Sequence, residues 1–295
     1  MGSSPRSGYV ALLGRPNVGK STLLNALVGE PVAIVTHKPQ TTRHRITGIV
    51  NRCEGQAIFV DTPGLHRRRD HALNRRLNRA ASDVRAEVDV IVVVVDARRL
   101  TDEDEMVLEL VERLEVPRIL AFSKIDLLDR RALLLERTEQ LTGRIEFDAV
   151  VYLSAHRGEG LDALLEEVFR RLPAGDPIFE SDLFTDRSER FLAAEMIREQ
   201  LMLQLHQELP YGLTVIIERF EHAPSRLEID AQILVDSDRH KGMVIGRGGQ
   251  VLKRVGTRAR RKIAELLGQR VHLELHVKTH AGWLDDDGAL DDLGF

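Results

Sequence analysis

The chain has 295 residues, enough for two domains, and 43% of them are hydrophobic, so a substantial core can form. The formal net charge of -4 is unevenly spread, and the single cysteine, Cys53, excludes an intramolecular disulfide bond and a cysteine zinc site. No apolar run reaches the roughly 20 residues of a transmembrane helix, and the N-terminus has neither a signal-peptide nor a myristoylation pattern. We therefore expect a cytoplasmic protein without a transmembrane segment.

The first part of the chain, residues 1–175, alternates short apolar runs with helical patterns. The apolar runs are rich in valine and almost continuous, as expected for strands covered on both faces. The alternation predicts an α/β fold with a mostly parallel sheet and helices on both faces. Strands are predicted at residues 10–13, 45–51, 57–61, 90–95, 119–122 and 150–153, and helices at residues 20–28 and 161–172 among others.

A loop that matches G-x-x-x-x-G-K-[ST] joins the first predicted strand to the first predicted helix. Its glycines let backbone N–H groups converge on a phosphate at a helix N-terminus. Lys20 would reach the β- and γ-phosphates, and the Ser21 hydroxyl would bind Mg²⁺. A chance glycine-rich turn is the alternative, which the strand and helix on either side disfavour. The predicted phosphate-binding residues are Gly14, Arg15, Pro16, Asn17, Val18, Gly19, Lys20, Ser21 and Thr22.

A D-x-x-G motif, Asp61 to Gly64, ends the second hairpin strand. Alone it is an ordinary turn, but after a phosphate loop it predicts a nucleotide switch in which Asp61 holds Mg²⁺ and the Gly64 N–H senses the γ-phosphate. One threonine of the preceding polar loop should also close onto Mg²⁺, and we favour Thr42 over Thr41; a simple surface loop is the alternative. The predicted switch residues are Gln40, Thr41, Thr42, Asp61, Thr62, Pro63, Gly64 and Leu65, with Ser21, Thr42 and Asp61 as Mg²⁺ ligands.

Two later strands end in motifs that predict a guanine pocket. Asp126 can accept hydrogen bonds from N1–H and N2–H₂ of guanine, which adenine cannot offer, and the Lys124 stem would pack over the base. Ser123 stands where the N-K-x-D motif has asparagine, which predicts weaker binding of guanine; a surface ion pair is the alternative for this motif. The predicted guanine-binding residues are Ser123, Lys124, Asp126, Ser154, Ala155 and His156, with the Ala155 N–H directed at guanine O6.

The pattern breaks at residues 173–177, the best candidate for a domain boundary. We predict a linker at residues 176–187, an α+β domain at residues 188–280 and an acidic C-terminal tail at residues 281–295, which should be mobile from Asp285 onward. The second domain should contain a long helix at residues 188–209, strands at residues 214–220, 226–235 and 271–278, and a glycine-rich turn between the last two strands.

That turn contains G-x-x-G and precedes a strongly basic helix. Between residues 239 and 278 there are eleven Lys and Arg but only two acidic residues. The combination predicts a type II KH domain, whose G-x-x-G loop clamps the backbone of single-stranded RNA; a solvated basic helix after a tight turn is the alternative. The predicted RNA-binding residues are Lys241, Ile245, Gly246, Arg247, Gly248, Gly249, Lys253 and Arg254.

Taken together, these motifs resemble the Era family of bacterial GTPases, which belongs with the TrmE/Era-related P-loop GTPases. The matching segments span nearly the whole chain: GRPNVGKSTLLNAL, QTTRHRITGI, DTPGLH, TDRSERFLAAEMIREQL, ELPYGLTVIIERF, MVIGRGGQ and VHLELHVK followed by AGWLDD. The resemblance implies GTP or GDP and Mg²⁺ as ligands, the 3′ end of small-subunit (16S) ribosomal RNA and the 30S subunit as partners, and a role in 30S assembly. It also implies a cytoplasmic monomer that associates peripherally with the inner face of the cell membrane.

The resemblance also bears on catalysis. Leu65 occupies the place where many GTPases have a glutamine that orients the attacking water, and leucine cannot do this. Asn17 matches a position that in related GTPases helps to bind a charge-stabilising potassium ion. His66 as a water-positioning residue is the less favoured alternative.

Two functions remain open at this point. The first is a slowly hydrolysing GTPase that switches RNA binding on and off. The second is an RNA chaperone or binding module whose nucleotide domain hardly turns over GTP.

Overall fold

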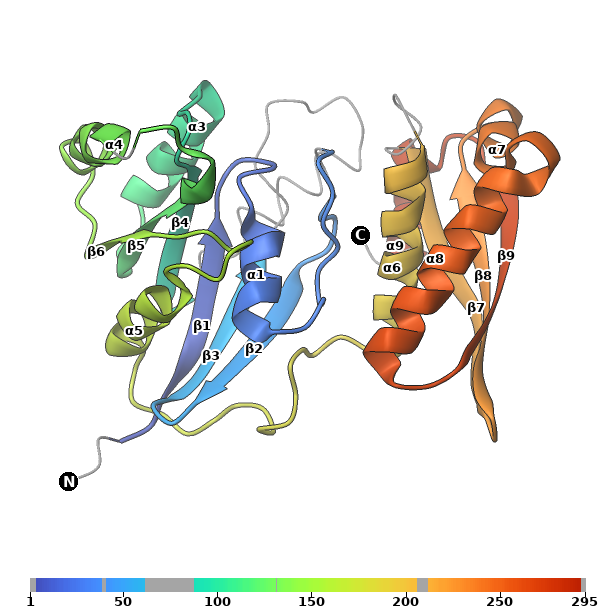
Figure 1. Ribbon diagram of the computed structural model, residues 1–295, viewed down its shortest axis with the longest axis horizontal. Coiled ribbons are helices and arrows are strands. Elements are labelled where there is room, and N and C mark those ends of the chain that lie inside the picture. Colours follow the sequence, from blue (N-terminus) through green and yellow to red (C-terminus); the bar gives the residue numbers. More distant parts are fainter. Residues whose placement is uncertain (1–3, 39–40, 62–87, 131, 206–211, 293–295) are drawn as a thin grey trace. The chain divides into compact units, whose positions relative to one another are not determined.

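The computed structural model describes residues 4–38, 41–61, 88–130, 132–205 and 212–292, and these fall into two compact units (Figure 1). The first unit holds residues 4–33 and the described residues from 42 to 186. The second unit holds residues 34–38, Thr41 and the described residues from 187 onward. The short segment before the first hairpin thus packs with the second unit, whereas the sequence predicted it as part of the first domain.

The centre of the first unit is a six-stranded sheet with the order β2-β3-β1-β4-β5-β6. Strands β2 and β3 pair antiparallel, and all other neighbours pair parallel. This confirms the predicted mostly parallel sheet and its opening hairpin. The strands are β1 (Arg6–Leu13), β2 (Ile46–Arg52), β3 (Gly55–Asp61), β4 (Val90–Asp96), β5 (Arg118–Ser123) and β6 (Ala149–Tyr152).

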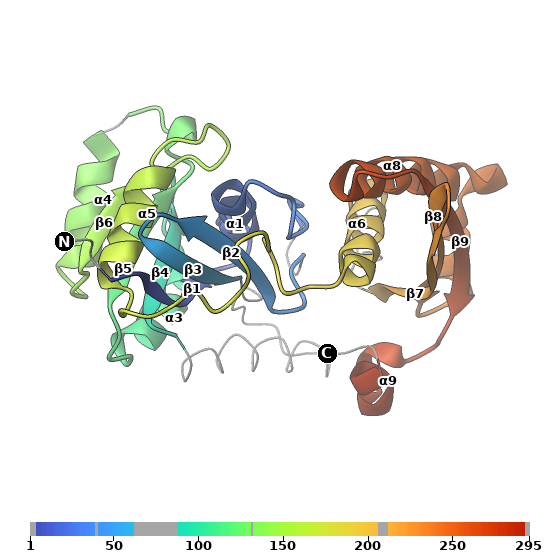
Figure 2. The same ribbon diagram turned by 90° about the horizontal axis from the view of Figure 1, so that it is seen from below.

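Helices cover both faces of this sheet, which explains why its strands are continuously apolar. All seven residues of β4 are buried, as in a central strand with no solvated face. On one face, Val107 and Leu108 of α3 (Asp102–Glu112) and Leu141 of α4 (Ala132–Thr142) join a buried cluster with β1, β4 and β5. Helices α1 (Lys20–Val28) and α5 (Leu161–Arg171) contact the sheet from the opposite face (Figure 2).

The segment that follows α5, predicted as a linker, is tied to the edge of the sheet. The buried amide of Gln56 on β3 accepts hydrogen bonds from the backbone N–H groups of Ile178 and Phe179 (2.9 and 2.8 Å) and donates to the Phe179 carbonyl (2.9 Å). Further along, the Thr185 hydroxyl donates to the carbonyl of Thr47 (2.6 Å). These contacts place residues 176–186 on the first unit.

The second unit is a three-stranded sheet with helices on one face (Figure 2). Strand β8 pairs antiparallel with β7 and parallel with β9, and the chain order α-β-β-α-α-β confirms the predicted type II KH topology. One buried cluster joins the strands to α6 and α8. The elements are α6 (Glu189–Gln204), β7 (Leu213–Ala223), β8 (Arg226–Val235), α7 (Asp238–Ile245), the short helical turn η4 (Arg247–Gly249), α8 (Gln250–Leu267) and β9 (Val271–Thr279).

The C-terminal tail, predicted to be mobile from Asp285 onward, is anchored where the structure describes it, with Leu290 fully buried. It forms the turn η5 (Trp283–Asp285) and helix α9 (Asp287–Asp292), and the Trp283 side chain is fully buried with its indole N–H donating to the Gly212 carbonyl (3.3 Å). Burial of the large indole ring of Trp283 stabilises this arrangement. The acidic side chains around it stay in water, so their charges do not oppose it. Among the helices that the structure describes, none combines the length and apolar character needed to span a bilayer.

Candidate nucleotide and RNA sites

The phosphate loop, residues 14–21, connects the carboxyl end of β1 to the start of α1. A Cβ atom at Gly14 would lie 2.5 Å from the carbonyl oxygen of Val94, so only glycine fits there. Asn17 and Gly19 take left-handed backbone conformations with φ of 62° and 109°. Gly19 is the N-cap of α1 and provides no side-chain cap, which leaves the helix N-terminus suited to an anion.

Lys20 lies folded into this loop. Its ammonium group donates to the carbonyls of Gly14 (2.8 Å) and Arg15 (3.2 Å), and only 6% of the residue is exposed. Burial lowers the pKa of Lys20, and the nearby Asp61 carboxylate opposes this shift. The Lys20 ammonium group can therefore give up these hydrogen bonds to the carbonyls and donate to phosphate oxygens instead.

Three oxygen-bearing side chains meet beside Lys20. The Ser21 hydroxyl donates to Asp61 Oδ2 (2.5 Å) and lies 2.9 Å from the Thr42 hydroxyl, which itself lies 3.3 Å from Asp61 Oδ2. Asp61 is fully buried, burial raises the pKa of its carboxyl, and Oδ1 has no hydrogen-bond partner. A buried carboxylate oxygen left unpaired beside two hydroxyls fits a hard cation such as Mg²⁺, which prefers oxygen ligands. We name these three residues the oxygen cluster.

The other predicted switch residues are placed differently. The Thr41 hydroxyl contacts Thr36 (2.6 Å) and the Lys38 carbonyl (2.7 Å), so Thr42 and not Thr41 joins the oxygen cluster. The Thr41 carbonyl accepts from Arg198 of α6. Gln40, Thr62, Pro63, Gly64, Leu65 and His66 lie outside the described residues.

The predicted base pocket is built from the ends of β5 and β6. The buried Ser123 hydroxyl contacts the carbonyls of Val18 (2.6 Å) and Val95 (3.0 Å), so it ties the end of β5 to the phosphate loop. Lys124 has a left-handed backbone, and its ammonium group donates to the Asn17 carbonyl (2.5 Å) and to Asp96 (3.0 Å). The lysine stem therefore lies across the phosphate loop.

Asp126 and Ala155 carry the groups that would read a base. Asp126 is half-buried in η2 (Ile125–Leu127), and its carboxylate has no hydrogen-bond partner in the described part of the chain. Ser154 is buried and pairs with Glu159 across a short bridge, whereas the Ala155 N–H donates to no atom of the described residues. His156 is exposed. A free acceptor and a free donor are what guanine requires at its N1–H and O6 edges.

The sequence motifs did not single out Asp96 and Asp104. Asp96, at the end of β4, bonds Arg98 (2.8 Å) and Lys124 (3.0 Å). Burial alone would raise the pKa of Asp96, but hydrogen bonds from Arg98 and Lys124 outweigh it and hold the pKa below its usual value. Asp104 accepts from Arg15 Nε (2.9 Å) with both side chains buried, which fixes the phosphate loop to α3. The sequence could have indicated Asp96, because it ends a buried strand in the same way as Asp61 does.

The G-x-x-G loop, residues 246–249, joins α7 to α8. A Cβ atom at Gly246 would lie 2.4 Å from Val251, whereas at Gly248 and Gly249 it would meet nothing within 4 Å, although both have positive φ. The last two glycines are therefore open to an approaching ligand. Lys241 and Ile245 are half-buried next to the loop, and Arg247, Lys253 and Arg254 are exposed.

Comparisons with known proteins match both units. The family model described as 50S ribosome-binding GTPase matches residues 9–124, and the KH domain model matches residues 208–284. GTPase Era of Bordetella avium (strain 197N) is 47% identical over 290 residues, covering 98% of both chains. GTPase Era of Pseudomonas entomophila (strain L48) is 47% identical over 293 residues, covering 99% of this chain and 98% of its own.

Two solved structures have the same fold at full length. A single-residue variant of Aquifex aeolicus Era bound to GDP.AlF4- has a TM-score of 0.94 at 35% identity, with 98% of this chain and 99% of that chain covered. Era in complex with MgGDPNP and nucleotides 1506-1542 of 16S ribosomal RNA gives the same TM-score, identity and coverage. Because the identity extends over almost the whole length and both domains match, the chain belongs to the Era family of GTPases.

Proposed function

We propose that the protein is a Mg²⁺-dependent GTPase switch that binds the 3′ end of 16S ribosomal RNA and acts in assembly of the 30S subunit. The observation that carries the proposal is the oxygen cluster of Ser21, Thr42 and Asp61 next to the buried Lys20. A solved relative that holds MgGDPNP and a fragment of 16S ribosomal RNA supports the assignment of these ligands.

Each part of the proposed nucleotide site has a distinct task. The phosphate loop and Lys20 bind the phosphates, and Asp126 with the Ala155 N–H selects guanine. The oxygen cluster holds Mg²⁺, which supplies charge neutralisation at the phosphate oxygens. Because Thr42 belongs to both the cluster and the segment leading into the hairpin, loss of the γ-phosphate would release this segment.

Hydrolysis would be slow in the isolated protein. Leu65 cannot orient the attacking water, so a potassium ion held at Asn17 would provide the additional positive charge. We further propose a cytoplasmic monomer that associates peripherally with the inner face of the cell membrane. The corresponding domain assignments are a KH domain from residue 188 and a connecting segment at residues 176–187, most of which packs on the first unit.

Measuring GTP turnover in potassium and in sodium, each with and without RNA, tests this function. We expect slow turnover that potassium accelerates more than sodium, and Asn17→Ala should remove that difference while retaining nucleotide binding. Turnover no faster than that of Lys20→Ala, in every condition, would favour the RNA chaperone. RNA affinities that are equal in the apo, GDP and GTP-analogue forms would also defeat the switch, which requires a coupling of about 5–150-fold. Equal turnover rates in the two salts would contradict only the proposed potassium site at Asn17.

A further inference from the structure

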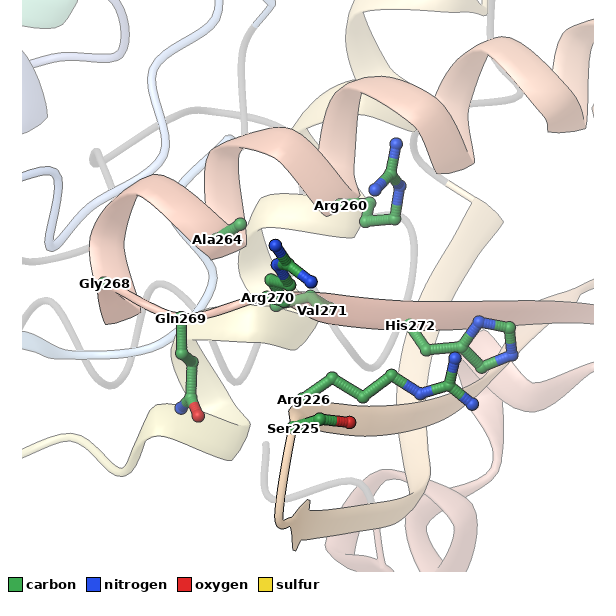
Figure 3. A pocket seen from close by; sticks show the side chains of 9 residues that line it. All are labelled: Ser225, Arg226, Arg260, Ala264, Gly268, Gln269, Arg270, Val271 and His272. Carbon is green, nitrogen blue, oxygen red and sulfur yellow. The ribbon is translucent and has the colours of Figure 1, made fainter.

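A basic pocket lies at the end of the second unit where α8 finishes and β9 begins (Figure 3). The turn between β7 and β8 completes its wall, and its volume is about 940 Å³. Figure 3 shows the Arg260 side chain reaching from α8, that of Arg226 from the start of β8 and that of Arg270 from the turn just before β9. We call it the arginine pocket, and its lining residues are Ser225, Arg226, Arg260, Ala264, Gly268, Gln269, Arg270, Val271 and His272.

The charge of the arginine pocket is not neutralised by its own wall. Three of the lining residues are arginines, one is a histidine, and none is acidic. Arg226 pairs with Glu228 (3.1 Å), but Arg260 and Arg270 have no ion-pair or hydrogen-bond partner for their side chains in the described part of the chain. The C-terminus of α8 adds a negative partial charge of about half an elementary charge, which the unpaired guanidinium groups exceed. An anion is therefore the ligand that this pocket favours.

The arginine pocket is separate from the G-x-x-G loop but is connected to it along α8. Arg260 lies ten residues after Gln250, the first residue of α8, which corresponds to about 15 Å along the helix axis. A G-x-x-G clamp engages about four nucleotides. Lys253, near the loop, and Arg260, in the pocket, are seven residues apart and therefore share one face of the helix. A phosphate backbone that follows this face leads from the loop to the pocket.

We propose that the arginine pocket binds phosphate groups of an RNA segment outside the one held at residues 246–249. The guanidinium group suits this ligand because its planar fork donates two parallel hydrogen bonds to phosphate oxygens. The proposal rests on the RNA-binding function proposed above. The phosphates can come from a single-stranded extension of the clamped strand or from an adjoining base-paired stem, and the chemistry of the contact is the same.

The test compares a double variant, Arg260→Ala with Arg270→Ala, against RNAs of different length. A short single strand of about six nucleotides should bind the variant as tightly as the wild type. A longer RNA should lose its additional affinity and bind the variant about as tightly as the short strand. The slope of log affinity against log salt should fall by roughly 1.4–1.8 for two lost phosphate contacts. Longer probes with a single-stranded or a hairpin extension identify the source of the phosphates.

The controls separate this proposal from general charge effects and from the function itself. Arg113→Ala with Arg170→Ala removes the same charge from exposed positions of the first unit and should leave the affinity for both RNAs unchanged. Thermal unfolding should show that both double variants are folded. Equal loss for short and long RNA, no loss for either, or loss only of binding to vesicles with anionic lipid would overturn the arginine pocket as an RNA site. If Arg247→Asp with Gly248→Asp leaves all RNA binding intact, the proposed RNA function itself fails.

Discussion

The protein contains two glycine-rich loops, one in each unit, that lead into a helix in a similar way but differ in what surrounds them. Both lead into a helix whose N-cap is a glycine with a left-handed backbone and no side-chain cap, Gly19 before α1 and Gly249 before α8. The first N–H groups of α1 thus remain available to an anion, whereas the first N–H of α8, that of Gln250, already donates to the Arg247 carbonyl. The two units therefore share the glycine N-cap but not the set of free N–H groups behind it.

The surroundings of the loops differ. Gly14 of the phosphate loop packs against the Val94 carbonyl, and the charges beside the loop, Lys20 and Asp61, are buried. In the G-x-x-G loop, Gly248 faces open space and Arg247 is exposed. The phosphate loop is thus held in place by the core of its unit, whereas the last glycines of the G-x-x-G loop are open to solvent. Added atoms at packed positions of the phosphate loop should therefore disturb the fold more than added atoms at the open positions of the G-x-x-G loop.

The largest expected effect is that a variant in each loop loses one ligand and keeps the other. Lys20→Ala should weaken GTP binding by about 10²-fold or more, because it removes charge-assisted hydrogen bonds to two phosphates. It should leave RNA binding without nucleotide unchanged. Arg247→Asp with Gly248→Asp should abolish RNA binding and leave GTP affinity unchanged, because the two units have separate cores. Calorimetric titration of each variant with each ligand measures both.

A combined loss would contradict the separation. If Lys20→Ala also weakened RNA binding in the absence of nucleotide, the two sites would share more structure than their separate cores imply. Arg113→Ala serves as the exposed control and should change neither affinity.

An effect of similar size concerns the choice of base. Asp126→Asn replaces an acceptor by a donor opposite guanine N1–H, so preference should shift toward xanthosine nucleotides by about 10²-fold. Asp129→Asn, an exposed position in the same loop, is the matched control and should keep the preference for GTP. Competition between the two nucleotides measures the shift. An unchanged preference in Asp126→Asn would remove this residue from the base pocket.

The sequence predicted what depends on local pattern and missed what depends on distant partners. Strand β4 was predictable because its apolar run is uninterrupted, and the phosphate loop because its motif requires glycine and lysine at fixed spacing. The pairing of Arg15 with Asp104 was not predictable, because 89 residues separate them and only the tertiary fold brings them together. Trp283 was missed for the same reason, since its acidic neighbours masked a side chain that is buried against Gly212.

Matched glycine substitutions test the difference in packing directly. Gly14→Ala should destabilise the first unit by about 1–3 kcal/mol, because the new methyl group meets the Val94 carbonyl and the strand behind it cannot yield. Gly248→Ala meets no atom, so only its left-handed backbone is unfavourable, by about 1–2 kcal/mol. Denaturant unfolding measures both changes, and GTP and RNA affinities are recorded alongside. Equal GTP affinity in Gly14→Ala and wild type would contradict a preorganised phosphate loop.

The smallest expected effect is a gain in stability from Asp61→Asn. Burial raises the pKa of the Asp61 carboxyl above its usual 3.8, so the folded state binds this proton more tightly than the unfolded state. Stability therefore falls as the pH rises from that value through the raised pKa, and at neutral pH the buried charge is unfavourable. Replacing it with a neutral amide of the same shape should stabilise the nucleotide-free protein at pH 7 by about 1 kcal/mol, since a buried charge is removed. The gain should shrink toward acidic pH, where the wild-type carboxyl is protonated. Asp129→Asn, exposed, should leave the pH profile unchanged, and the Mg²⁺ dependence of nucleotide binding should be lost only in Asp61→Asn. If the variant is no more stable than the wild type at pH 7, Lys20 and the hydroxyls of Ser21 and Thr42 already compensate the charge of Asp61. The buried carboxylate would then bind Mg²⁺ without lowering the stability of the nucleotide-free protein.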